Sequence, residues 1–436
     1  MQKCPKTSGA SGPVANATSG CMRVRIHRGT QEIGGTCIEL ETEGARLLLD
    51  LGLPLDGDLS DTASHPSIEG LAGDSNLLGL VLSHGHVDHW GLAPLAGPDL
   101  PVALGAATLR ILQAAAPFVP RPYVPARPIE FTNGSSVQFG PFRITAHLVD
   151  HSAYDAHAIE VEASGTRLFY SGDIRGHGRK AGLFEKMLSH PPKDVDVMLI
   201  EGSSFGRLDP DRSFPAEAEV EQRFVELFRQ TKGLALVAAS AQNIDRMVSL
   251  YRACKRTGRT LIIDLYTAEI LRATENARIP QSDWQNVAVY VPQYQRVQIK
   301  RAARFDLIER HRTNRIFAEQ LFEIAPKSAL LFRPAMLDDL KHAASLSGAV
   351  AIWSQWDGYL RQDRGLALVR ELSSLDIPIE DAHTSGHASI KDLKRLASAI
   401  APKMLVPIHT YAPAAFLDHF DAVALKHDGE WWDIPA

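Results

Sequence analysis

The stretch Ser83–Gly91 reads SHGHVDHWG and places His84, His86, Asp88 and His89 within six positions. It follows the apolar run NLLGLVL, which predicts a buried strand that ends just before these side chains. Imidazole and carboxylate groups are ordinary metal ligands in proteins. Without a cation, so many polar groups in one place would be costly to remove from water. The stretch therefore predicts part of a metal site at the exit of a strand.

Three further candidate ligands also stand at the ends of predicted strands: His151 in VDHSAYD, Asp173 in YSGDIR and His409 in VPIHTY. Strand ends that share an edge of a sheet can converge on one site. A pair of metal ions needs roughly six or seven ligands, one of them bridging, and the chain supplies that number. Asp50 in LLLDLG is predicted to orient a ligand from behind, while His147 is expected inside its strand.

Bulk composition is that of an ordinary globular protein, with 436 residues, 45% apolar and 22% charged. The net charge of −5 gives no support to a nucleic-acid binder, although a local basic groove stays open. The four cysteines form no CxxC pair, which fits a reducing compartment, and we expect a cytoplasmic protein. No run approaches the length of a membrane span.

Four segments follow one another along the chain. Residues 1–21 are rich in Ser, Gly and Ala and are predicted to be a disordered extension, with Met22 as an alternative start. Residues 22–205 read as short strands with interspersed helices, and residues 206–365 alternate strand and helix as parallel βα units. Residues 366–436 repeat that rhythm and end in a run that resembles a strand. The fold class predicted is α/β.

At this point the residues resemble a known family. HGHVDH is similar to the signature of metallo-β-lactamase-fold hydrolases, and DLG at Asp50, the histidine at 151 and SGD at Asp173 match that family's other motifs in order. IEGSSFG at Glu201, SGHAS at His387 and VPIHT at His409 resemble motifs A, B and C of its β-CASP branch. Ribonuclease J and the endonuclease that processes pre-mRNA 3′ ends belong to this branch.

The resemblance implies a four-layer αββα metallo-β-lactamase domain, residues 22–205 and 366–436, with a parallel α/β β-CASP cap, residues 206–365, inserted in it. Because the chain ends some 27 residues after His409, we expect it to lack the further C-terminal domain of ribonuclease J. Two metal ions are also implied. The ligands that the resemblance assigns are His84, His86 and His151 for one ion, Asp88, His89 and His409 for the other, and Asp173 as the bridge.

Hydrolysis of a phosphodiester is the chemistry that this set implies. Two cations would lower the pKa of a bridging water, and the resulting hydroxide would attack phosphorus, with Asp88 steering the proton. His387 would sit over the scissile phosphate and protonate the leaving oxygen, and Glu201 would orient the ring and raise its pKa. The histidine-rich set favours Zn²⁺, and Mn²⁺ suits the same geometry.

Substrate contacts are predicted around the same motifs. Ser385, Gly386 and Ser389 precede a helix and could bind phosphate, although Ser389 could equally be a plain N-cap. Arg175, which closely follows the bridging Asp173, is also placed to touch a substrate.

Two features of the cap are open to two interpretations each. Arg296, Lys300 and Arg304 are one helical turn apart and could follow a phosphate backbone, or they could form a solvated helix face. Trp353 and Trp356 in WSQWDG could stack bases, or they could pack at a domain junction.

Three functions remain in view. The first is a ribonuclease J-like exo- or endonuclease that acts on single-stranded RNA, with DNA as the alternative. The second is a hydrolase of a small thioester, lactone or phosphoester. The third is a non-catalytic β-CASP subunit. No membrane partner is expected, and the oligomeric state stays open.

Overall fold

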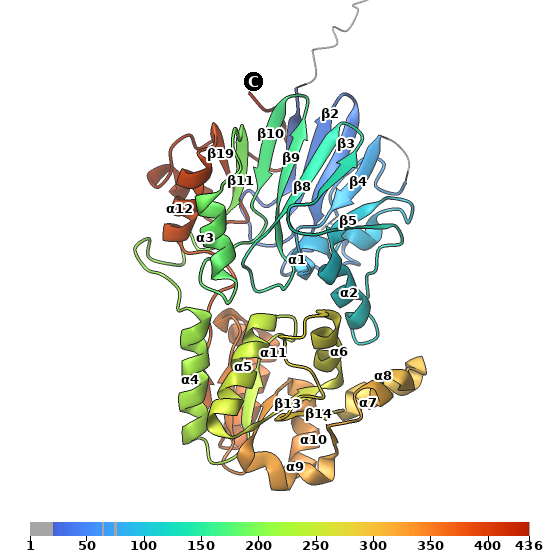
Figure 1. Cartoon of the computed structure of the whole chain (residues 1–436), viewed down its shortest axis with the longest axis vertical. Coiled ribbons are helices and arrows are strands. Elements are labelled where there is room, and N and C mark those ends of the chain that lie inside the picture. Colours follow the sequence, from blue (N-terminus) through green and yellow to red (C-terminus); the bar gives the residue numbers. More distant parts are fainter. Residues whose placement is uncertain (1–20, 63–64, 74–75, 436) are drawn as a thin grey trace, which may run out of the picture.

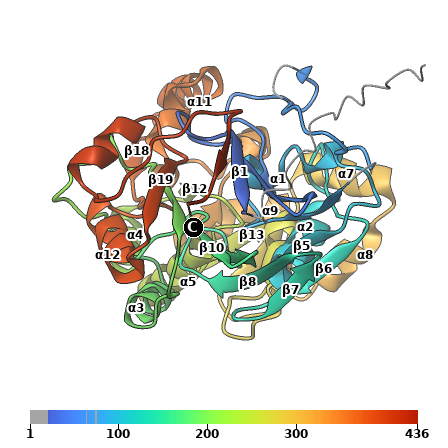
Figure 2. The ribbon, with the colours of Figure 1, turned by 90° about the horizontal axis from the view of Figure 1, so that it is seen from above.

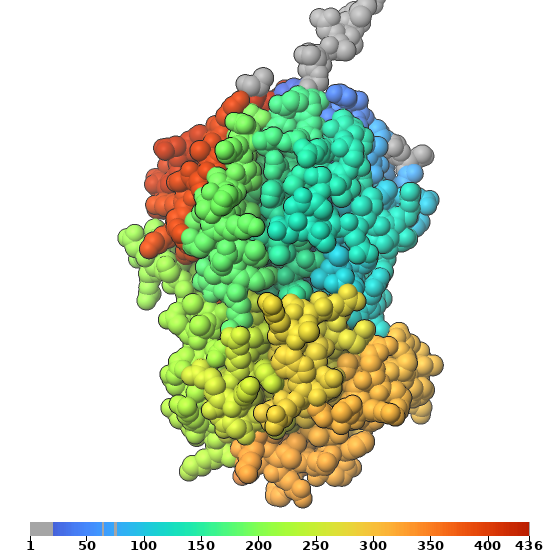
Figure 3. All heavy atoms as spheres, viewed as in Figure 1, coloured from blue at the N-terminus to red at the C-terminus, as the bar shows by residue number. Residues whose placement is uncertain are grey.

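The computed structural model describes residues 21–62, 65–73 and 76–435. Within these residues the chain forms two bodies joined at a narrower waist (Figures 1 and 3). The upper body of Figure 1 holds two sheets, and the lower body holds a third. Except for Cys21, the predicted N-terminal extension lies outside the described residues.

The first sheet combines strands from both ends of the chain. Its strands, in spatial order, are β20 (Trp431–Asp433), β1 (Arg23–Arg28), β2 (Cys37–Thr42), β3 (Ala45–Leu51), β4 (Leu77–Val81), β5 (Val102–Gly105) and β6 (Pro128–Phe131). The pairs from β20 to β3 are antiparallel, and those from β3 to β6 are parallel. The C-terminal strand thus returns to pair with the strand that begins the fold.

The second sheet shows the same return of the chain. Its strands, in spatial order, are β19 (Met404–Ile408), β11 (Val197–Glu201), β10 (Thr166–Tyr170), β9 (His157–Ala163), β8 (Phe142–Leu148) and β7 (Ser136–Phe139). β19 runs parallel to β11, although some two hundred residues separate them in the sequence. The intervening chain leaves after β11, builds the lower body and comes back before β19.

The two upper sheets pack face to face because alternate side chains of each are apolar. Val24, Ile26 and Ile38 from the first sheet share one buried cluster with Ile144 and Val161 from the second. Helices cover the outer faces: α1 (Val87–Trp90) and α2 (Ala106–Ala115) on the first sheet, and α3 (Ala181–Ser189) and α12 (Ile390–Ile400) on the second (Figure 2). The predicted four-layer αββα arrangement is confirmed.

The third sheet is entirely parallel and has helices on both faces. Its strands, in spatial order, are β15 (Arg315–Ile316), β14 (Val287–Tyr290), β13 (Thr260–Asp264), β16 (Ser328–Leu331), β12 (Ala235–Ala238), β17 (Val350–Trp353) and β18 (Ile379–Asp381). Covering helices on one face are α4 (Glu217–Gln230), α5 (Ile244–Thr257) and α6 (Leu265–Ala273). On the other face lie α9 (Ala318–Ile324), α10 (Leu337–His342) and α11 (Asp363–Ser374).

Three local expectations need correction or refinement. The segment that carries Arg296, Lys300 and Arg304 does not form one helix: α7 (Gln293–Ala302) ends before Ala303, whose φ is 53°, and α8 (Phe305–Arg310) follows it. Arg304 pairs with Asp306, so it is not on the same helix as Arg296 and Lys300. Only Trp431–Asp433 of the final strand-like run forms a strand. β18 joins the third sheet although it follows residue 365, where the sequence predicts the cap to end.

No helix among the described residues is both long and apolar enough to cross a membrane.

Glu269 on α6 is a buried acid in the lower body that should make stability depend on pH. Its carboxylate contacts His311 Nε2 at 2.7 Å, Arg310 Nη1 at 2.7 Å and Arg272 Nη2 at 2.9 Å. Burial would raise the pKa of Glu269, but His311 and Arg272 outweigh it and lower the pKa from 4.5 to about 2. Because this pKa is lowered on folding, the ionised carboxylate stabilises the fold at pH values above the ordinary pKa of 4.5. This stabilisation is lost as the pH falls toward 2.

We therefore expect Glu269→Gln to lower the free energy of unfolding by ~2 kcal/mol near neutral pH. The deficit should shrink by about half near pH 3.5, because the wild-type protein then loses the same contribution. Urea unfolding of both proteins at the two pH values measures this difference. Glu309→Gln, a change at an exposed acid, is the control. A deficit independent of pH would show that packing, and not charge, explains the effect.

Candidate metal centre

Seven metal-ligand candidates gather at one edge of the two upper sheets. β4 leads to HGHVDH, where α1 carries Asp88 and His89. β8 leads to His151, β10 leads to Asp173 and β19 leads to His409. Residues separated by more than 300 positions thus meet because four strands end at the same rim.

One group consists of His84, His86 and His151, joined by Asp173. His86 Nδ1 lies 3.2 Å from His84 Nε2 and 3.1 Å from His151 Nε2. Nitrogens that bind one tetrahedral ion at 2.0–2.1 Å stand about 3.3 Å apart, so the three imidazoles have the spacing of a shared cation.

A second group consists of Asp88, His89 and His409, and it also includes Asp173. Asp173 Oδ2 lies 3.3 Å from His89 Nε2 and 3.7 Å from His84 Nε2, while Oδ1 lies 3.9 Å from His409 Nε2. Asp88 Oδ2 is 3.8 Å from His89 Nε2 and 4.0 Å from His409 Nε2. Asp173 alone belongs to both groups, which is the place that the family resemblance assigns to the bridging ligand.

Buried polar atoms in the second group lack hydrogen-bond partners among the described residues. They are His89 Nε2, Asp173 Oδ1 and His409 Nε2. A buried polar atom without a partner costs about 1–3 kcal/mol, so such atoms in a folded protein call for an explanation. Imidazole nitrogens and carboxylate oxygens are metal ligands, and these three residues belong to one group whose ligand atoms lie close together. A divalent metal ion therefore fits the residues that are present.

Asp50 sits behind the second group and holds one of its histidines. Its carboxylate accepts hydrogen bonds from Ser83 N at 2.7 Å, Tyr170 Oη at 2.6 Å and His89 Nδ1 at 2.7 Å. Donation from His89 Nδ1 fixes the ring so that Nε2 faces Asp173 in the second group. Asp50 is fully buried, with a φ of 56°, so its backbone is strained in the left-handed region.

A backbone carbonyl fixes His151 in the same way. His151 Nδ1 donates to the carbonyl oxygen of Gly386 at 2.6 Å, which leaves Nε2 facing the first group. A Cβ at position 386 would stand 2.7 Å from Ser152 Oγ and 3.3 Å from His151 Cε1, so a larger residue there would have to displace the Ser152 hydroxyl. Gly386 thus orients a ligand candidate, a role that sequence reasoning missed when it predicted a phosphate contact.

Burial and nearby charges shift the pKa of several ligand candidates toward the forms that bind metal, whereas Asp173, Asp88 and Asp50 outweigh burial at His89 and raise its pKa well above the usual value. Burial and the neighbouring imidazoles hold the pKa of His84 and His151 well below the usual value, so both rings are neutral. Burial would raise the pKa of Asp173, but His409 and His89 outweigh it and hold that pKa well below its ordinary range. Neutral imidazoles and an ionised carboxylate are the forms that ligate metals.

His387 and Glu201 lie beside the cluster. His387 Nδ1 is 3.5 Å from Glu201 Oε1 and 3.8 Å from Asp173 Oδ2. Burial would lower the pKa of His387, but the two carboxylates outweigh it and raise it to about 9. Glu201 is fully buried and is itself held by the N–H and hydroxyl of Ser203 and by the N–H of Ala388.

The remaining predicted substrate contacts have other partners. Ser389 caps α12: its hydroxyl accepts from Asp392 N at 3.2 Å and donates to Asp392 Oδ2 at 2.9 Å. Ser385 Oγ accepts from His387 N at 3.0 Å. Arg175 is fully buried, and its guanidinium contacts Asp150, Asp245 and the Ser385 carbonyl, so its position does not allow a substrate contact.

Sequence reasoning also missed two side chains that support the ligands. Tyr170 donates to Asp50, and Thr36 Oγ1 lies 3.0 Å from His409 Nδ1. The sequence contained only a weak indication of either role: Tyr170 directly precedes the SGD motif, and Thr36 follows Gly34 and Gly35. Three other histidines that are near the ligand candidates in the sequence lie outside the cluster: His147 is in β8 as expected, His157 begins β9, and His177 contacts the Ser385 carbonyl.

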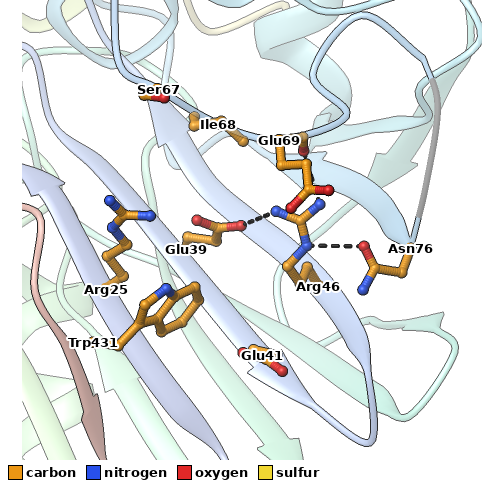
Figure 4. Close-up of a pocket in the computed structure, with 9 residues that line it drawn as sticks. All are labelled: Arg25, Glu39, Glu41, Arg46, Ser67, Ile68, Glu69, Asn76 and Trp431. Carbon is orange, nitrogen blue, oxygen red and sulfur yellow. Dashed lines mark hydrogen bonds and ion pairs between the residues drawn. The ribbon is translucent and has the colours of Figure 1, made fainter.

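A separate hollow of about 620 Å³ lies on the outer face of the first sheet (Figure 4). Its charges largely satisfy one another: Glu39 is buried and contacts His27 Nε2 at 2.8 Å and Arg46 Nη1 at 2.6 Å. Trp431 lies over Arg25 in the same hollow. None of the seven ligand candidates lines it, so it is distinct from the metal cluster.

Comparison with known families supports the assignment of the first body. A model described as "Beta-lactamase superfamily domain" matches residues 47–221. This region is similar to the domains of the β-lactamase superfamily. The match includes HGHVDH, His151, Asp173 and Glu201, so the resemblance drawn from those motifs is confirmed.

Curated relatives extend the similarity beyond that region. "Ribonuclease J" of Mycobacterium tuberculosis (strain ATCC 25618 / H37Rv) is 28% identical over 300 residues, 63% of this chain and 51% of that protein. The "RNase J-like protein" of Methanocaldococcus jannaschii is 25% identical over 279 residues, 58% of this chain and 59% of that protein. The chain spans about half the length of the curated relatives that it matches.

One solved structure has the same fold over nearly the whole chain. It is a protein of unknown function from Enterococcus faecalis V583, with a TM-score of 0.76 and 21% sequence identity. The alignment covers 95% of this chain and 100% of that chain, so the two-body arrangement occurs in an experimental structure.

We expect His86→Ala and Asp173→Ala each to weaken divalent metal binding by at least ~100-fold, because each removes a ligand from the cluster. Metal per chain, measured by elemental mass spectrometry after dialysis, checks this. His147→Ala is the matched control, since His147 pairs with Glu160 outside the cluster. Metal content that is unchanged in both ligand variants would contradict the site.

Proposed function

We propose that this protein is a metal-dependent nuclease that hydrolyses phosphodiester bonds in single-stranded RNA. The observation that carries the proposal is the pair of ligand groups that share Asp173, with His387 and Glu201 beside them. Paired metal groups of this kind serve in-line displacement at phosphorus. Similarity to proteins named ribonuclease J supports RNA as the substrate.

Two divalent ions are proposed, Zn²⁺ as first choice and Mn²⁺ as the alternative. His84, His86 and His151 would hold one, Asp88, His89 and His409 would hold the other, and Asp173 would bridge them. When bound, the ions would supply Lewis acidity, which activates water and offsets the charge on phosphate. His-rich ligand sets suit zinc, while carboxylates keep manganese in play.

The chain's own groups would move the protons. Asp88 is the least buried member of its group, with 19% of its side chain exposed, and it can accept a proton from the attacking water. His387 keeps its proton at neutral pH because of Glu201 and Asp173. Since Nδ1 faces Glu201, Nε2 is the atom that would give a proton to the leaving oxygen.

Glu201 would act through His387. Its carboxylate is too buried to meet a substrate, yet it faces the imidazole at 3.5 Å. It therefore orients the ring and favours the charged form, as an adjacent carboxylate does. The hydrogen bonds from Ser203 and Ala388 hold Glu201 itself in place.

Cleavage of matched end-labelled strands tests the substrate. The set contains single-stranded RNA and DNA, each with a 5′-phosphate or a 5′-hydroxyl, with added zinc or manganese. We expect RNA to be cut and Asp173→Ala to abolish cutting. Stepwise release of mononucleotides that prefers a 5′-phosphate would indicate a 5′-exonuclease, and internal cuts would indicate an endonuclease. If no strand is cut while metal is bound, the proposal fails in favour of a small-molecule hydrolase or a non-catalytic subunit.

His387→Ala should lower the turnover number by ~10²–10⁴-fold, the range for loss of a general acid, and should leave metal content nearly unchanged. Turnover is measured on the RNA strand that the wild-type protein cuts. His427→Ala, a change at an exposed histidine, is the control. Loss of metal together with turnover would instead make His387 a structural residue.

A further inference from the structure

Two aromatic side chains of the lower body stand partly in solvent on the connection between β17 and α11. Trp356 is 41% exposed and Tyr359 is 43% exposed. Their rings meet edge to face, with centroids 5.4 Å apart. Trp353 Nε1, at the end of β17, donates to the Trp356 carbonyl at 3.2 Å. The pair is therefore fixed in position although it is exposed.

This pair lies beside the loops of the metal cluster. Arg207 lies over the Trp356 ring, 5.1 Å from its centroid. Arg207 follows motif A, and a Cβ on its neighbour Gly206 would stand 3.5 Å from Ala412 Cβ, three residues past His409. On the other side, burial and the nearby charge of Asp88 raise the pKa of Tyr359. The aromatic pair thus connects the lower body to the rim of the cluster.

Arg207 is an exposed cation with no carboxylate partner among the described residues. It differs in this from Arg175, Arg179 and Arg246, which pair with acids. Exposed aromatic rings beside an unpaired arginine are the combination that binds single-stranded nucleic acid, because bases stack on rings and on guanidinium planes.

Packing accounts for only part of the arrangement. Gly358 lies so close to the Trp356 ring that a Cβ there would meet ring atoms at 2.3 Å, so one part of the ring is covered. The remaining exposed part and Tyr359 face solvent. A pair that served only to join the two bodies would bury these surfaces, because the burial of apolar area is what stabilises a junction.

We propose that Trp356 and Tyr359, together with Arg207, form a stacking platform for one base of a single-stranded nucleic acid whose phosphodiester lies at the metal cluster. The inference rests on the proposed function and goes further, since it names the contact that selects unpaired strands. A base paired in a duplex cannot stack on protein rings, so the platform favours single strands of any sequence.

Substrates with and without a base provide the test. The substrate is a short RNA that the wild-type protein cuts, and its partner has abasic sites across the cleavage position. We expect Trp356→Ala to raise KM for the normal strand by ~5- to 150-fold, the range for loss of one stacked base. KM for the abasic strand should stay unchanged, as should metal content. Trp356→Phe should recover part of the loss.

Matched variants separate stacking from charge and from folding. Tyr359→Leu should behave as Trp356→Ala does, whereas Tyr359→Phe should keep the wild-type KM. Arg207→Ala should also flatten the salt dependence of binding. Trp431→Leu, in the hollow on the far face of the first sheet, is the control tryptophan.

The outcomes are distinct. An equal loss on normal and abasic strands would make Trp356 structural and overturn the platform. A wild-type KM in Trp356→Ala would overturn it too. If the wild-type protein cuts no nucleic acid with metal bound, the proposed function fails first, and the platform falls with it.

Discussion

The guanidinium of Arg175 is fully buried, and the arrangement of the metal cluster depends on the groups that neutralise its positive charge. A buried guanidinium is tolerated only when every donor finds an acceptor. Here Asp150 accepts from Nε at 3.3 Å, Asp245 accepts from Nη2 at 2.6 Å and the Ser385 carbonyl accepts from Nη1 at 3.1 Å. Burial would lower the pKa of Arg175, but the two carboxylates outweigh it.

These partners come from three parts of the chain. Asp150 precedes the ligand candidate His151, Asp245 lies in the first turn of α5 in the lower body, and Ser385 lies where the chain crosses back to the upper body. The crossing segment then offers the Gly386 carbonyl to His151 and places His387 beside Asp173. Movement of the lower body would therefore also move the ligand candidate His151 and the proposed acid His387, because the charge of Arg175 connects the segments that hold them.

Sequence patterns predicted the parts of the structure that depend on local periodicity. The short strands predicted within residues 22–205 include β1 to β4 and β8 to β11, and strand ends located the ligand candidates. Ala303 could not be foreseen as a helix end, because alanine favours helices and nothing nearby marks a stop. Arg175 was misjudged for another reason: its proximity to Asp173 in the sequence was visible, whereas Asp245 and Ser385 were distant.

The contrast between Arg175 and Arg207 explains why net charge is a poor guide to what this protein binds. Arg175 follows the SGD motif and Arg207 follows motif A. Arg175 is buried and pairs with internal carboxylates, whereas Arg207 is exposed to solvent. The charge of Arg246 is likewise buried and neutralised by Glu217, so a ligand cannot contact it. A chain with a net charge of −5 can therefore present a cation beside its metal cluster, because paired interior charges contribute little to the field that an approaching phosphate feels.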